Sequence, residues 1–168
     1  MQVYTSDQFE LPLPAGHRFP MAKYRLLRMR VEAAAQALGA HLLEAPRADD
    51  AAVLRVHTPD YVQRVRDGSL SEAEQRRIGF PWSPAMAERT RRASGATMAA
   101  LQSAIEGCGV GINLAGGTHH AFADHGQRVQ PLPQVGGDAL GRMTIPVLRH
   151  APALAAAGQD LVGTVEDG

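Results

Sequence analysis

The sequence is poor in cysteine and in long apolar runs. Its single cysteine, Cys108, excludes an internal disulfide framework and a cysteine-based metal cluster. No apolar run approaches the roughly 20 residues that a membrane-spanning helix requires, so we expect no membrane partner. The first residues, MQVYTSDQFELPLP, lack the basic start and apolar stretch of a secretory signal. The cytoplasm is therefore the expected location.

The chain also lacks net charge. Its 17 Lys and Arg residues balance 17 Asp and Glu residues, and the pI is about 7.1. No broad basic field is present, so we expect no nucleic-acid partner. What remains is ordinary for a globular domain: 168 residues, 45% hydrophobic and 20% charged, enough for one domain with a core.

Aromatic residues are missing from the last part of the chain. All eight lie before position 128, and the tail from Arg128 onward also has no lysine or cysteine. That tail contains four prolines and six glycines. We therefore predict an N-terminal portion, residues 1–127, followed by an atypical tail, residues 128–168.

The N-terminal portion alternates β-prone segments with helical patterns, as α/β domains do. Residues 1–6, 40–46 and 108–117 are predicted strands, and the last of them ends in a glycine turn. Helix-end signals predict helices over 20–38, 59–67 and 84–106, and residues 48–57 also have a helical pattern. Ser71 and Glu74 have the spacing of a capping box. The apolar stripe of the first helix is Tyr24, Leu27, Val31, Ala34 and Leu38; that of the longest is Met86, Ala93, Leu101 and Ile105, with Thr97.

Two adjacent histidines follow the glycine turn in AGGTHH, residues 115–120. They stand at the carboxyl end of a predicted strand, where open parallel sheets place their ligand sites. Imidazoles bind metals or transfer protons, but neighbouring side chains act together only where an irregular backbone turns both toward one point. The alternative is one ring in the core and one exposed. A small metal site with His125 and Asp124 is also open, although its spacing matches no established zinc pattern.

Four separated segments resemble the zinc-dependent histone deacetylase family, which includes bacterial acetoin-utilisation and acetylpolyamine deacetylases. NLAGGTHHAFADHGQ is similar to the family's active-site segment. GHRFPMAKYRLLRMRVEAA is similar to its N-terminal segment, with an HRFPMxKY pattern typical of the class IV branch. LRVHTPDYV and RIGFPWSPAMAERTRRASGATMAA also fit, in the right order. The resemblance covers roughly residues 1–127 and implies an arginase–deacetylase type fold, in which helices flank a parallel sheet.

The resemblance implies zinc-dependent hydrolysis of N-acetyl amide bonds, with acetyl-lysine or acetylated small amines as substrates. Zinc acidifies a bound water, and His119 and His120 jointly hold the positions that take its proton and assist the leaving amine. Gly116 and Gly117 shape the turn beneath the pair. Arg25 matches a family arginine near an internal cavity, and it equally fits a cation on a helix surface.

Three further residues in the matching segments have a simpler interpretation. We expect Asp60 to be a first-turn helix charge, Tyr61 to pack in the core and His17 to stabilise a loop.

The chain departs from the family after HGQ. The family continues with GFC, an Asn-Asp pair and an Asp-x-His strand that supplies zinc ligands, and a further loop supplies a third ligand, an aspartate. This chain reads RVQPLPQ and has no Asp-x-His. We therefore predict that it does not bind zinc and is inactive alone, its tail being a frameshift or truncation product. A non-catalytic interaction fragment and a small metal-binding protein that uses His119, His120 and His125 are the alternatives.

The predicted fold is an incomplete, helix-rich α/β fragment of arginase–deacetylase type with an irregular C-terminal tail. Only about three strands are found before residue 128, fewer than a family sheet needs. The strand that ends at Leu114 is therefore predicted to have an unpaired edge, through which the chain self-associates.

Overall fold

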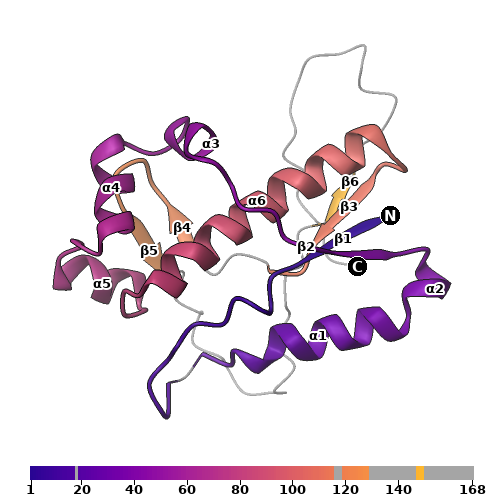
Figure 1. Cartoon of the computed structure of the whole chain (residues 1–168), viewed down its shortest axis with the longest axis horizontal. Coiled ribbons are helices and arrows are strands. Elements are labelled where there is room, and N and C mark those ends of the chain that lie inside the picture. The colour runs from indigo at the N-terminus through magenta and orange to yellow at the C-terminus, as the bar shows by residue number, and fades with distance from the viewer. Residues whose placement is uncertain (18, 116–118, 129–146, 150–168) are drawn as a thin grey trace, which may run out of the picture.

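A computed structural model describes residues 1–17, 19–115, 119–128 and 147–149 (Figure 1). A four-stranded sheet has the order β2-β1-β3-β6. Three of its strands, β1 (Gln2–Thr5), β2 (His41–Glu44) and β3 (Val110–Asn113), are parallel. The fourth, β6 (Val147–Arg149), is antiparallel to β3. This arrangement confirms the helix-rich α/β class.

Two helices cover opposite faces of this sheet. Val3, which is fully buried in β1, packs with Leu27 and Val31 of α1 (Ala22–Ala33). The hydroxyl group of the next residue, Tyr4, forms a 2.8 Å hydrogen bond with the hydroxyl group of Ser103 in α6 (Pro84–Glu106). Because successive strand residues face opposite ways, α1 and α6 sandwich the sheet, as Figure 1 shows.

Small residues form the face of α6 that packs on the sheet. Ala96, Ala100 and Ala104 are buried, whereas Leu101 and Ile105 are about half exposed. The stripe predicted from the larger apolar residues is therefore wrong over the C-terminal half of α6. The physical reason is close packing, because the helix backbone approaches the sheet too closely for large side chains to fit between them.

The helix ends follow the predicted signals. Thr58 caps α4 (Pro59–Asp67), and Gly68 ends it in the left-handed conformation. The capping box of Ser71 and Glu74 begins α5 (Glu72–Ile78). Ser83 caps α6. The predicted helix over 20–38 is divided at Ala34 into α1 and α2 (Ala35–Leu38), and a short α3 (Asp50–Leu54) precedes α4.

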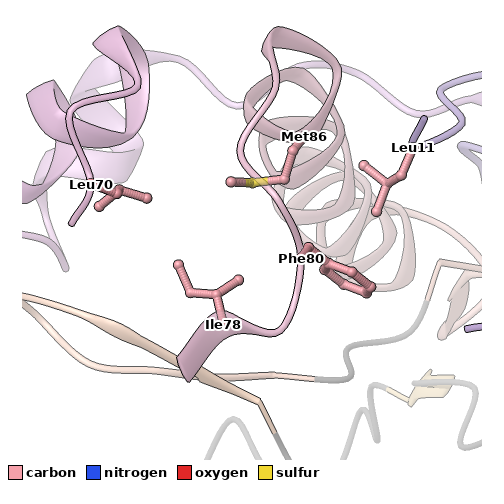
Figure 2. Close-up of a cluster of buried hydrophobic side chains, with 5 residues drawn as sticks. All are labelled: Leu11, Leu70, Ile78, Phe80 and Met86. Atoms are coloured by element: carbon pink, nitrogen blue, oxygen red, sulfur yellow. The ribbon is translucent and has the colours of Figure 1, made fainter. Parts of the chain in front are cut away.

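A second group of elements gathers at the N-terminal end of α6. It consists of α3, α4, α5 and a hairpin of β4 (His119–Ala121) and β5 (Gly126–Arg128) (Figure 1). Side chains from the N-terminal loop, both ends of α5 and the start of α6 form a buried cluster, as Figure 2 shows: Leu11, Leu70, Ile78, Phe80 and Met86. This cluster supports the part of the molecule that carries the two histidines.

The sheet differs from the sequence-based expectation at one edge. We expected the edge of β3 to be unpaired, but Val110, Gly111 and Ile112 pair with β6, which comes from the tail. That prediction is wrong. The rest of the tail after Arg128 lies outside the described residues. No helix in the described part of the chain is both long and apolar enough to span a membrane.

Candidate functional site

The carboxyl ends of β1 and β3 lie side by side, because the two strands are parallel neighbours. Thr5 ends β1 and Ser6 follows it, and Asn113 ends β3 and is followed by Leu114 and Ala115. All five residues are buried. After Ala115 the chain passes to β4 through residues 116–118, so Gly116 and Gly117 lie outside the described residues. The predicted site follows the carboxyl end of a strand, and in the structure the histidine pair follows β3 in the chain.

Asn113 fixes the direction in which the chain leaves β3. Its side chain is 2% exposed, and Nδ2 donates to the Ala93 carbonyl at 3.1 Å and to Thr97 Oγ1 at 2.9 Å, both in α6. Its Oδ1 accepts a 2.8 Å hydrogen bond from the Ala115 backbone N–H. All three hydrogen bonds are buried or partly buried, so Asn113 anchors the turn to the longest helix. The sequence-based reading did not identify this residue.

His119 and His120 are the first two residues of β4. Their backbones pair with Arg128 and Gln127 in an antiparallel hairpin. An irregular backbone is the condition for the two rings to act together, whereas the described backbone of these residues is an extended strand. The positions of the two rings lie outside the described residues.

A cavity of about 870 Å³ lies next to this segment. Ala115 and Ala121, the residues on either side of 116–120, both line it, so the chain that carries the histidine pair joins two points of the cavity wall. Side chains around it are mostly apolar, with Phe19, Tyr24, Tyr61 and Met86 among them. Such a lining suits a ligand with an aliphatic or acyl part.

One buried cation stands in the cavity wall. Arg89 is 8% exposed, and its Nη1 donates to the carbonyl oxygens of Ser6 at 2.9 Å and Phe9 at 2.7 Å. Its guanidinium lies 4.4 Å from the centre of the Tyr24 ring. A buried charge needs such partners, and here two carbonyl dipoles and an aromatic face provide them.

Lys23 is a partly buried cation of α1 that lines up with two aromatic rings, whereas Arg25 is exposed. Its Nζ lies 4.5 Å from the centre of the Phe19 ring and 5.0 Å from that of Tyr24. Burial, and secondarily the charge of Arg89, lowers the pKa of Lys23 below its usual value. Arg25 is exposed on α1, with Nη1 3.8 Å from Met29 Sδ. The signal for Lys23 was available in the sequence, since Phe19 lies four residues before it and Tyr24 directly after it.

The remaining candidates occupy simpler positions. Asp60 pairs with Arg64 at 2.8 Å in the first turn of α4, and Tyr61 packs against the cluster shown in Figure 2. In the N-terminal loop, Nδ1 of His17 accepts from the Phe19 N–H at 3.2 Å. His125 Nδ1 lies 2.6 Å from Asp124 Oδ1 at the tip of the hairpin.

No set of zinc ligands is seen among the described residues. Across these parts of the chain, no three His, Cys, Asp or Glu side chains come together as a metal site would require. The full sequence contains no Asp-x-His pattern. The arrangement therefore offers a cavity, a buried guanidinium and a strand with two histidines, without a recognisable ligand set.

Comparison with known proteins gives two matches. A family model described as the histone deacetylase domain matches residues 17–127. An uncharacterised protein of Picosynechococcus sp. is 41% identical over 124 residues, which are 74% of this chain and 41% of that protein. The chain thus spans about two fifths of the length of this relative. The family match ends one residue before Arg128, where the tail composition begins.

Proposed function

Because the chain belongs to the histone deacetylase family, we propose that residues 1–127 are the N-terminal portion of a class IV-like, zinc-dependent deacetylase domain, and that residues 128–168 are an atypical tail. The proposed reaction of the whole domain is hydrolysis of N-acetyl amide bonds. Its substrates would be acetyl-lysine or acetylated small amines, and its location the cytoplasm. The apolar cavity beside the histidine segment supports this substrate class, since an acetylated lysine has a long aliphatic stem.

In this proposal His119 and His120 form the acid–base pair. One takes a proton from the attacking water and the other protonates or stabilises the leaving amine. Gly116 and Gly117 would form the turn before the pair. The supporting observation is that Ala115 and Ala121, on either side of these residues, both line the cavity. Arg25 stays a candidate substrate-binding residue, although its side chain is exposed in the structure.

We further propose that the 168 residues do not hold zinc and do not release acetate by themselves. The observation that carries this is the missing Asp-x-His pattern in the sequence, together with the absence of any cluster of three metal-ligating side chains among the residues that the structure describes. An acid–base pair contributes roughly 10²–10⁴-fold to a rate only when a nucleophile is present to act on.

A second candidate is a non-catalytic interaction fragment. Met98, Leu101 and Ile105 of α6 are 45%, 48% and 51% exposed. Since they recur at helical spacing, they form an apolar face that a further part of the domain or another protein would cover.

Zinc titration by calorimetry, with an acetate-release assay on an acetyl-lysine peptide, separates these functions. We expect neither stoichiometric binding nor zinc-dependent release from the unmodified chain. Robust zinc-dependent acetate release would contradict the proposed inactivity. Stoichiometric zinc binding that is lost in His125→Ala would instead support a small metal-binding protein and count against the deacetylase role.

A further inference from the structure

Two consecutive residues at the start of α4 hold the β4–β5 hairpin. His57 Nδ1 lies 2.8 Å from the carbonyl oxygen of Phe122. The backbone N–H of Thr58 donates to the carbonyl oxygen of Ala123, also at 2.8 Å. A carbonyl oxygen only accepts hydrogen bonds, so Nδ1 of His57 must carry the proton.

Helix capping explains why Thr58 is free to make this contact. Thr58 is the N-cap of α4, and its Oγ1 accepts from the Tyr61 N–H at 3.4 Å. The N–H of an N-cap residue has no partner inside its helix. Here that donor is used by the hairpin, so the cap stabilises the helix and anchors the hairpin with the same residue.

The base of β5 packs tightly on the same helices. A Cβ at Gly126 would stand 3.0 Å from Tyr61 Oη and 3.3 Å from Ile78 Cγ1. The hairpin therefore contacts the residues just before α4 at its turn, through Phe122 and Ala123. At Gly126, where β5 begins, it contacts both α4 and α5.

These contacts lie immediately beside the histidine pair. Phe122 directly follows β4, and Gly126 pairs with Ala121, which places Gln127 opposite His120 and Arg128 opposite His119. Fixing the turn and Gly126 therefore fixes the register of the strand that carries both histidines.

We propose that His57 is a positioning residue, which holds the backbone of His119 and His120 in place through its hydrogen bond to Phe122. This inference rests on the proposed function for its catalytic meaning. Without the His57 donor, the Phe122 carbonyl loses its partner and Thr58 alone anchors the turn.

The first test uses the unmodified chain with isotope-labelled histidines. The ¹⁵N resonances of His57 report which ring nitrogen carries the proton. We expect a protonated Nδ1, and a neutral ring protonated only at Nε2 would overturn the inference, because such a ring cannot donate to Phe122.

The second test compares three variants by the ring ¹H–¹³C resonances of His119 and His120. We expect both to shift or broaden in His57→Ala and to return in His57→Asn, whose amide nitrogen stands near the place of Nδ1. His41→Ala, which removes an exposed histidine of β2, is the matched control and is expected to leave them unchanged. Unshifted resonances in a folded His57→Ala variant, or no return in a folded His57→Asn variant, would contradict the inference.

These readouts need neither zinc nor turnover, so they separate the two proposals. In an active chimera that contains residues 1–127, His57→Ala is expected to lower kcat roughly 10- to 100-fold with KM little changed, and His57→Asn to restore most of it. Shifted histidine resonances with an inactive chimera would leave the positioning role standing and refute the deacetylase role. An active chimera that is insensitive to His57→Ala would support the deacetylase role and refute the positioning role of His57.

Discussion

Gly111 of β3 lies against Ala100 of α6 so closely that a Cβ at position 111 would stand 1.9 Å from the Ala100 carbonyl oxygen. The nearest atoms all belong to the Ala100 backbone, so rotation of a side chain cannot relieve the overlap. Gly111→Ala is therefore expected to lower the free energy of unfolding by about 3 kcal/mol or more, the upper end of the cost of overpacking. Urea unfolding followed by circular dichroism measures it.

Gly39→Ala is the control for the backbone contribution. Gly39 ends α2 at φ 57°, and a Cβ there meets nothing within 4 Å. The expected loss is only about 1 kcal/mol, from the left-handed backbone. Equal losses in the two variants would show that the helix does not approach β3 as closely as described.

Arg89 is expected to contribute to stability through the two carbonyl groups that it contacts. Arg89→Met keeps much of the side-chain volume but leaves the Ser6 and Phe9 carbonyls without this donor, which costs about 3 kcal/mol in unfolding free energy. The exposed Arg55→Met is the control, with an expected change within about 0.5 kcal/mol. An Arg89→Met variant as stable as the unmodified chain would refute the buried contact.

Glu74 makes stability depend on pH. The Arg64 guanidinium, and then the hydrogen bonds from Ser71, lower the pKa of Glu74 from 4.5 to about 2. Since the folded-state pKa is below the unfolded one, the stabilisation is complete above pH 4.5 and is lost as the pH falls towards 2. We expect Glu74→Gln to be less stable at pH 7 by about 1 kcal/mol and to match the unmodified chain near pH 2.

Glu72→Gln tests whether this effect is specific. Glu72 pairs with Arg76 on the solvent side of α5, with 89% of its side chain exposed, and is expected to change stability little at any pH. A stability difference for Glu74→Gln that stays constant from pH 7 to pH 2 would contradict the assignment.

The pairing of β6 with β3 is expected to limit self-association. Leu148 pairs with Gly111, and Leu148→Pro removes a backbone donor from this short strand. An exposed strand edge invites pairing with another chain. Size-exclusion chromatography with light scattering should therefore show more oligomer for Leu148→Pro. An unchanged monomer fraction would mean that β6 does not protect the edge.

Local signals predicted the helix ends well, since Thr58, Ser71 and Ser83 each bind the backbone of their own helix. Such contacts are set within four residues and can be read from the sequence. The prediction that Leu101 and Ile105 lie on the buried face of α6 was wrong. Which face is buried depends on how closely α6 packs on the sheet, and that is a long-range property.

The hairpin and the anchoring groups of the site were not predicted. The segment HHAFADHGQR has no alternation of apolar and polar residues and no two-residue glycine turn, so nothing in it indicates β4 and β5. His57, Arg89 and Asn113 act on partners 65, 80 to 83 and 16 to 20 residues away in sequence. Contacts of that kind follow from the fold and leave no local pattern.

A chimera tests whether residues 1–127 can serve as the N-terminal portion of an active deacetylase domain. Residues 1–127 are joined to the part of the Picosynechococcus protein that follows its matched segment, and zinc-dependent acetate release from an acetyl-lysine peptide is measured beside the 168-residue chain. We expect acetate release by the chimera, at least 100-fold less release from its His119→Ala and His120→Ala variants, and none from the 168-residue chain. A folded, zinc-loaded chimera that releases no acetate, or one unaffected by both histidine substitutions, would contradict this expectation.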